Sequence, residues 1–133
     1  MIEGYSRGVG VMIVQNNKLL LTYRIKGDQL GVWEVVAGHI ESDEKPEDTA
    51  IRETKEETGI DIRITRHIGK NIDDTHRFEA DIFLAEVVSG EIQNLDPRNH
   101  SELKWFELTD LPCPLGSTTI KGLELLEKKD LIQ

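Results

Sequence analysis

Alternating apolar and polar positions dominate the chain, and they predict more strands than helices. A β-branched run over residues 9–14 and an apolar run over residues 19–23 flank Asn16-Asn17, a pair that favours the tight turn of a β-hairpin. Isoleucines alternate with polar residues over residues 61–68, which is typical of a strand with one buried face. Further strands are predicted at residues 33–36, 78–88 and 104–107.

Two segments have the periodicity and the end signals of helices. The first covers residues 46–58, with Pro46 in its first turn and Gly59 just beyond its end. The second covers residues 118–129. Its apolar stripe consists of Ile120, Leu123 and Leu126. We therefore expect one α/β (α+β) domain over residues 1–133, in which the helices pack on a mixed β-sheet.

Size and composition favour a soluble globular protein. The 133 residues are 38% hydrophobic and 31% charged, and no apolar run approaches the roughly 20 residues that span a bilayer. The first ten residues lack the basic and apolar regions of a signal peptide. The single cysteine, Cys113, excludes an internal disulfide and reads as an incidental thiol between two prolines. A cytoplasmic protein without membrane contact is the simplest expectation.

The formal net charge of -9 restricts the partners. A general grip on the backbone of a nucleic-acid duplex requires clustered Lys and Arg, which this balance disfavours. A small phosphorylated substrate stays compatible with it, because acidic residues can hold a divalent cation that attracts phosphate. The plain alternative is that the acidic balance only maintains solubility.

The acidic residues concentrate in one segment that includes the first predicted helix. Eight of the 25 lie there: Glu41, Asp43, Glu44, Glu47, Asp48, Glu53, Glu56 and Glu57. At about 100° per residue, Glu53, Glu56 and Glu57 share one arc of the helix. This arc lies beside a modest core-facing stripe formed by Ala50, Ile51, Thr54 and Thr58.

Three neighbouring carboxylates destabilise an isolated helix, and more so near its C-terminus. A hard divalent cation such as Mg²⁺ or Mn²⁺ would remove that cost, because it prefers carboxylate oxygen ligands. The alternative is a solvated charge ladder, since Asp48, Arg52 and Glu56 follow each other at four-residue intervals. The residues around the helix decide between these two readings.

The flanking residues fall into one fixed spacing. Gly38 is followed after five residues by Glu44, and after seven more by Arg52-Glu53-Thr54-Lys55-Glu56-Glu57-Thr58-Gly59-Ile60. This segment resembles the Nudix box, G-x5-E-x7-R-E-U-x-E-E-x-G-U, where U is a bulky apolar residue. The one departure is Thr54 at the first U position. Trp33-Glu34 before the box, and Trp105-Phe106 and Leu111-Pro112 after it, extend the resemblance over most of the chain.

The resemblance implies the Nudix fold, an α/β/α sandwich around a mixed β-sheet, and a hydrolase that acts on diphosphate bonds with Mg²⁺ or Mn²⁺. It implies metal ligands at the Gly38 carbonyl, Glu56 and Glu57, with Glu53 as a further ligand or the general base. Arg52 is expected to orient a carboxylate through a bidentate contact. Glu44 is expected to support the metal site.

Residues outside the box are weaker candidates. The resemblance places Arg24 toward a substrate phosphate, with a surface arginine as the alternative, and Glu102 as a metal ligand or base. His39 replaces a second glycine that is common after the first box glycine, and is expected to face the substrate or to be merely tolerated in its loop. The few candidates for stacking on a base are Tyr23, Trp33, Phe78 and Trp105. None of the four histidines has the paired helical spacing of a zinc site.

The segments Asn94-Leu95-Asp96-Pro97, Trp105-Phe106 and residues 111–115 resemble MutT-type enzymes. That likeness predicts hydrolysis of an NTP or dNTP to the monophosphate and pyrophosphate. ADP-ribose, nucleotide sugars and dinucleoside polyphosphates stay open as substrates. Less favoured alternatives are an isomerase of isopentenyl diphosphate and a non-catalytic nucleotide-binding domain. A homodimer also stays open.

Overall fold

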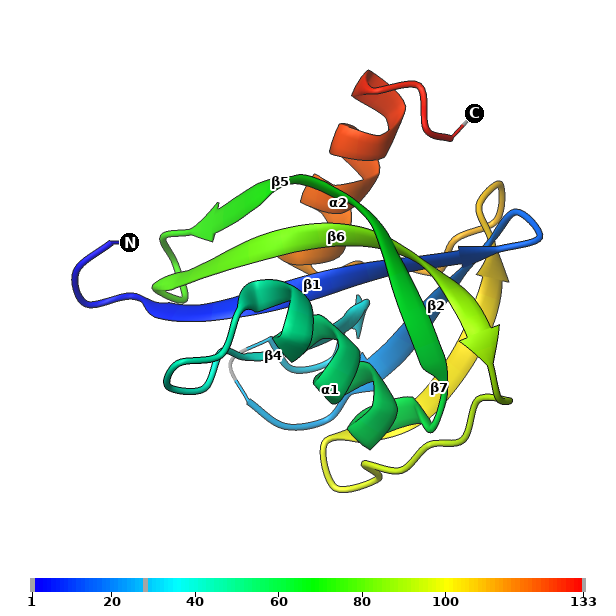
Figure 1. Ribbon diagram of the computed structural model, residues 1–133, viewed down its shortest axis with the longest axis horizontal. Helices are drawn as coiled ribbons and strands as arrows, with labels where there is room; N and C mark the ends of the chain where they lie inside the picture. The colour runs from blue at the N-terminus through cyan, green and yellow to red at the C-terminus, as the bar shows by residue number, and fades with distance from the viewer. Residues whose placement is uncertain (1, 28, 133) are drawn as a thin grey trace.

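The computed structural model describes residues 2–27 and 29–132 as seven strands and two helices. In chain order these are β1 (Ser6–Gln15), β2 (Lys18–Arg24), β3 (Trp33–Glu34), β4 (Val36–His39), α1 (Pro46–Thr58), β5 (Asp61–Asp73), β6 (Phe78–Ser89), β7 (His100–Glu107) and α2 (Ser117–Lys128). In Figure 1, β1 runs through the middle of the molecule with α1 and α2 on either side of it. None of the helices within the described ranges has the length and apolar character to cross a membrane.

Strand β1 joins the two parts of the sheet. It pairs in parallel with β6 and antiparallel with β4, and β6 continues to β5. At its far end β1 turns through Asn16 and Asn17, both with left-handed φ angles of 51° and 60°, into β2. Strand β2 then pairs with β3 and β7. The predicted hairpin and the predicted mixed sheet are both confirmed.

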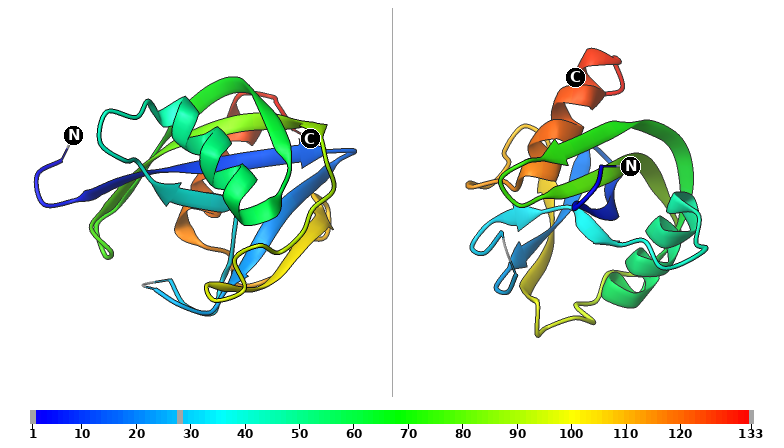
Figure 2. Two further views of the ribbon diagram at one scale, coloured as in Figure 1. Left: turned by 60° about the horizontal axis from the view of Figure 1, so that its bottom comes forward. Right: turned by 90° about the vertical axis from the view of Figure 1, so that its left-hand side faces the viewer.

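Alternation along β1 creates two cores, one under each helix. Val9, Val11 and Ile13 contribute to the core on the α1 side, whereas Met12 belongs to the core on the α2 side. Helix α2 approaches β1 closely because residue 122 is glycine, where a Cβ atom would lie 2.4 Å from the Met12 sulfur. The two helices thus cover opposite faces, as Figure 2 shows, and the predicted α/β/α arrangement is confirmed.

A buried carboxylate from β3 fixes the start of α2. Gly116 precedes the helix without a capping side chain. Instead, Glu34 Oε1 accepts hydrogen bonds from the backbone N–H of Thr119, at 2.7 Å, and from its hydroxyl. A carboxyl oxygen at this place accepts hydrogen bonds from groups in the first helical turn that the helix itself leaves without a partner. This contact sets the position of α2 against β3 and, with it, one wall of the cavity described below.

The helix over residues 46–58 is confirmed, but one apolar side chain predicted to face the core is exposed in each helix, Ile51 in α1 and Ile120 in α2. Ile51 is 41% exposed and Ile120 is 47% exposed, so placing them in the core was wrong. Small side chains face the sheet instead: Thr49, Ala50, Thr54 and Thr58 of α1, and Thr118, Thr119 and Gly122 of α2. The predicted core-facing positions of Ala50, Thr54 and Thr58 are thus confirmed, whereas the small buried residues of α2 were not part of the predicted apolar stripe, because close packing on a sheet selects small residues.

Strand boundaries differ from the prediction where tertiary pairing extends or divides an element. The strand expected over residues 33–36 is split into β3 and β4, which pair with different partners, β2 and β1. Strand β5 continues to Asp73 because it stays paired with β6 along its whole length. Strand β7 begins at His100 rather than at residue 104, through pairing with β2. The longer β7 brings His100 against α1.

Candidate active site

The Glu53 side chain of α1 lies against residue 38 of β4, in the space that a side chain there would occupy. A Cβ atom there would lie 2.2 Å from Glu53 Cδ, so any side chain would displace the Glu53 carboxylate. The requirement at this position is therefore space, which glycine supplies. The backbone of Gly38 and the carboxylate of Glu53 consequently share one small region.

Arg52 connects the carboxylates of the loop and the helix. Its Nε and Nη2 donate to the two oxygens of Glu44 at 2.7 and 2.9 Å, a bidentate pair. Its Nη1 donates to Glu53 at 2.9 Å and to Glu56 at 3.1 Å. Hydrogen bonds from Arg52 and then from Thr49 lower the pKa of Glu44 to about 2, so Glu44 stays ionised and holds the arginine in place.

Glu57 is the most buried carboxylate of the helix, with 7% of its surface exposed. Burial, a hydrogen bond with Glu53 and the charge on Glu53 all raise the pKa of Glu57. Two carboxylates that crowd each other in the interior cannot both ionise without a compensating cation. A hard divalent cation fits this partly buried, acidic set of oxygen atoms, which consists of the Gly38 carbonyl and the carboxylates of Glu53, Glu56 and Glu57.

Two residues that sequence reasoning did not single out lie beside Glu57. Asp96 and His100 each have a ligand atom within 4.8 Å of the others and of a Glu57 oxygen. His100 is 5% exposed, and burial lowers its pKa. No sequence spacing could reveal this group, because Asp96 and His100 reach α1 only through the docking of a distant loop.

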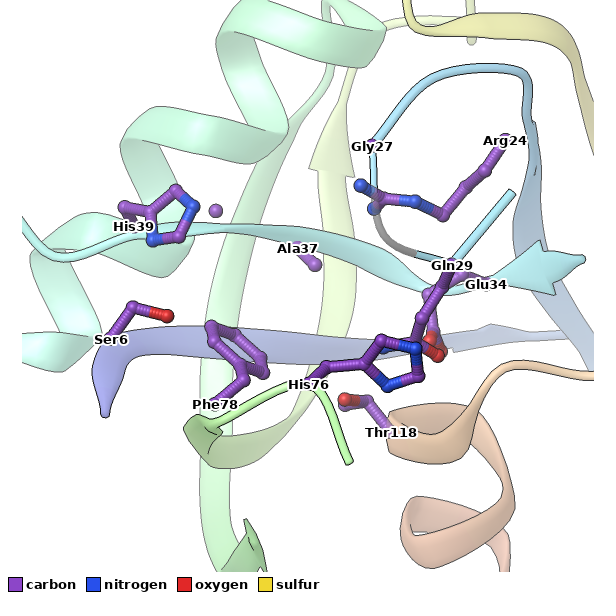
Figure 3. A pocket seen from close by; sticks show the side chains of 11 residues that line it. Ser6, Arg24, Gly27, Gln29, Glu34, Ala37, His39, His76, Phe78 and Thr118 are labelled. Atoms are coloured by element: carbon purple, nitrogen blue, oxygen red, sulfur yellow. The ribbon is translucent and has the colours of Figure 1, made fainter. Parts of the chain in front are cut away.

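A cavity of about 270 Å³ opens next to the box, on the side of Gly38 and His39. In Figure 3, Arg24 extends across the cavity from one wall, while Phe78 and His76 form the opposite wall. Burial raises the pKa of both Glu34 and Glu57, and the charge of Arg24 partly offsets that rise at each carboxyl group. The expected positions of Arg24 and His39 at a substrate site are thus compatible with the structure.

His76 is held in the cavity wall by a buried aspartate. Asp73, which is 8% exposed, accepts hydrogen bonds from the backbone N–H of His76 at 2.9 Å and from the Ser117 hydroxyl at 2.7 Å. The Nδ1 atom of His76 also lies 2.9 Å from this carboxylate. Burial raises the pKa of Asp73, but the hydrogen bonds outweigh it and the net shift is downward. The pair therefore presents an oriented imidazole to the cavity.

The remaining candidates lie elsewhere. Glu102 pairs with Lys104 at 2.9 Å on the outer part of β7. Trp105 packs against the α1-side core and lines a different hollow, beside Ile60 and Val87. Trp33 packs against Tyr23 and Phe106. Of the four aromatic residues considered for base stacking, Phe78 lines the cavity.

An acidic helix beside a cavity of about 270 Å³ on an α/β/α sandwich is compatible with a hydrolase of phosphorylated compounds, and comparison with known proteins identifies the family. The model of the NUDIX domain family matches residues 4–126. The chain belongs to the Nudix hydrolase family, whose members act on pyrophosphate bonds.

Relatives with different names share this domain. The NAD-capped RNA hydrolase NudC of Vibrio atlanticus (strain LGP32) is 33% identical over 119 residues, which are 86% of this chain and 42% of that protein. The MutT NUDIX hydrolase from Burkholderia pseudomallei has a TM-score of 0.81 and 32% identity, over 93% of this chain and 99% of that one. An ADP-ribose pyrophosphatase from Streptococcus suis 89-1591 has a TM-score of 0.73 and 27% identity, over 96% and 93%. The chain thus spans less than half the length of the NudC relatives that it matches.

Proposed function

We propose that this protein hydrolyses the diphosphate bond of a nucleoside diphosphate linked to a second group, such as ADP-ribose or NAD, with Mg²⁺ or Mn²⁺. The observation that supports this best is the adjacency of the box carboxylates, Arg24 and the 270 Å³ cavity. A metal site, a phosphate-binding cation and room for a further group lie in one continuous region. The net charge of -9 favours a free dinucleotide over a long RNA.

The names of two relatives support the same substrate class. NudC is named for NAD-capped RNA, and the Streptococcus suis enzyme for ADP-ribose. Both compounds contain a diphosphate between two nucleoside or sugar groups. The second group would require space beside the metal, and the cavity lined by His76 and Phe78 offers that space.

In this proposal the Gly38 carbonyl, Glu53, Glu56 and Glu57 hold the metal. When bound, the metal neutralises phosphate charge and lowers the pKa of a coordinated water. Glu53 is also the proposed general base, because it lies between Arg52 and the region of Gly38. Arg52 and Glu44 keep Glu53 in one orientation through their bidentate pair.

Arg24 is the proposed phosphate ligand. It extends into the cavity, and within the described residues its buried Nε atom has no hydrogen-bond partner. A guanidinium with donors to spare binds phosphate oxygens well. We also propose a cytoplasmic location, in keeping with the exposed free thiol of Cys113.

A second candidate is the hydrolysis of an NTP or dNTP to the monophosphate and pyrophosphate. It is favoured by the MutT NUDIX hydrolase from Burkholderia pseudomallei, which matches over 99% of its own length. Phe78 in the cavity wall would then stack on the base.

A product-resolved panel separates these functions. The metal-loaded protein would be incubated with ADP-ribose, NAD, a nucleotide sugar, a dinucleoside polyphosphate and the common and oxidised triphosphates. We expect AMP and ribose 5-phosphate from ADP-ribose, or AMP and nicotinamide mononucleotide from NAD, as the fastest reaction. Pyrophosphate released fastest from a triphosphate would replace the first proposal by the second. Background turnover of every compound would refute both.

A further inference from the structure

Glu57 faces a histidine that lies outside the Nudix box. Its Oε1 atom is buried and, among the residues described, has no hydrogen-bond partner. The Nε2 atom of His100 lies 3.9 Å from it. The side chains of Glu57 and His100 are only 7% and 6% exposed. An unsatisfied buried carboxylate oxygen is unfavourable, so a further partner between these two atoms is expected.

The separation suits a shared cation better than a direct contact. Hydrogen bonds between nitrogen and oxygen are about 2.7–3.2 Å long, so 3.9 Å is too far. Two ligand atoms that each lie about 2.1 Å from one ion are about 3.0–4.2 Å apart, depending on the angle between them. We propose that His100 Nε2 is a ligand of the divalent metal that Glu57 binds, so that the box carboxylates and one imidazole form the site.

Asp96 is the carboxylate next to the other ring nitrogen of His100. Its Oδ2 lies 3.6 Å from His100 Nδ1, which is too long for a hydrogen bond, so Asp96 acts on the imidazole through its charge. Histidines that bind metals commonly direct their second ring nitrogen to a carboxylate, which keeps the ligating nitrogen free of a proton. Asn99 donates to both oxygens of Asp96, at 3.0 and 3.1 Å, and so fixes this carboxylate.

The loop before β7 is anchored on the last turn of α1. The N–H of Gln93 donates to the Thr58 carbonyl at 2.9 Å, and the N–H of Leu95 donates to the Glu57 carbonyl at 3.0 Å. The Asn94 side chain donates to the His100 carbonyl at 2.8 Å. The backbone of Glu57 is thereby tied to the segment that supplies Asp96 and His100. These hydrogen bonds hold Asp96 and His100 next to Glu57.

A nitrogen ligand changes the choice of metal. Mg²⁺ prefers oxygen ligands, so a nitrogen ligand favours a transition-metal ion over Mg²⁺, most of all the later ones such as Fe²⁺, Ni²⁺ and Zn²⁺. This inference rests on the metal dependence of the proposed function and adds to it a preference for Mn²⁺ over Mg²⁺. Metal binding can be measured without substrate, so the two proposals can fail separately.

Electron paramagnetic resonance of bound Mn²⁺ tests the ligand directly. The tag-free protein would be loaded with Mn²⁺ alone, and the spin-echo modulation from a coordinated ¹⁴N nucleus recorded. We expect this modulation in the wild type, its loss in His100→Gln, and its retention in the control His67→Gln, since His67 is 51% exposed beside Asp81. Absence of ¹⁴N modulation in the wild type, or its retention in a folded His100→Gln, would overturn the proposal.

A complementary variant covers the case in which His100→Gln does not fold. Replacing the other three histidines (His39, His67 and His76) by Gln leaves His100 as the sole imidazole of the chain. Retained modulation in this variant supports the assignment, and lost modulation refutes it. By calorimetry, folded His100→Gln should lose about tenfold more affinity for Mn²⁺ than for Mg²⁺. Equal losses would also contradict the proposal.

Turnover separates this inference from the proposed function. ¹⁴N modulation together with background turnover on the whole panel would leave His100 as a ligand and remove the hydrolase proposal. Normal metal-dependent turnover without ¹⁴N modulation would support the hydrolase proposal and remove His100 as a ligand.

Discussion

Replacing Glu57 by Gln should stabilise the metal-free protein while removing its activity. The Glu57 carboxyl is 7% exposed and shares its surroundings with Glu53, and burial and then this neighbour raise its pKa from the ordinary 4.5 to about 10. The folded protein therefore keeps a proton on this group at neutral pH, whereas the unfolded chain releases it. Gln is nearly isosteric and takes up no proton, so the variant avoids that cost.

The magnitude follows from the pH and the unfolded pKa. Each pH unit above an unfolded pKa of 4.5 costs about 1.4 kcal/mol while the folded group stays protonated, which gives at most about 4 kcal/mol at a pH of about 7.5. Because the folded pKa is raised, the penalty grows as pH rises from 4.5 and vanishes below it. Since the Gln amide must itself be buried, we expect a gain of about 2–4 kcal/mol, or roughly 6–12 °C in Tm.

Thermal unfolding in EDTA, followed by circular dichroism at several pH values, measures this gain. The Tm difference between Glu57→Gln and the wild type should be positive at neutral pH and should disappear toward a pH of about 4.5. Adding Mn²⁺ should raise the Tm of the wild type but not that of the variant, because only the wild type binds it tightly. A variant that is less stable than the wild type in EDTA at neutral pH would refute the reasoning.

Three further changes test the packing. Thr54→Val should stabilise the protein by about 1 kcal/mol, because the buried Thr54 hydroxyl has no partner among the described residues; an unchanged or lower midpoint in urea would contradict this. Leu126→Ala should cost about 2–5 kcal/mol, whereas Ile120→Ala should stay within about 0.5 kcal/mol, since Leu126 is fully buried and Ile120 is 47% exposed; equal losses in denaturant unfolding would place the core on the wrong face. Gly38→Ala should lower kcat at least tenfold, because its Cβ would lie 2.2 Å from Glu53 Cδ. Full activity with an unchanged circular dichroism spectrum would show that residue 38 does not constrain the Glu53 carboxylate.

Local signals were sufficient for the box helix. Pro46 and Gly59 mark its ends within a few residues of the chain, and the helix begins and ends where they predict. The Asn16-Asn17 turn is equally local. The same locality explains the fixed spacing of the carboxylates, since one helix positions Glu53 and Glu57 on one face.

Tertiary contacts determined what the sequence could not predict. His100 reaches Glu57 because β7 starts early and its preceding loop binds the end of α1. Neither fact has a signal in spacing or hydrophobicity. Ile120 has a helical period that includes Leu126, yet the sheet packs against the neighbouring face of small residues. The exposed fraction of such side chains depends on the partner element, which a single segment does not encode.

Hydrolysis of a diphosphate bond with a divalent metal held by Glu57 is tested most directly by kcat. This constant would be measured on the best substrate of the panel, for the wild type and Glu57→Gln, in EDTA and after restoring Mg²⁺ or Mn²⁺. We expect wild-type turnover to disappear in EDTA and to return with the metal, while the folded variant stays orders of magnitude slower in every condition. Near-normal turnover in EDTA, or in folded Glu57→Gln, would contradict it.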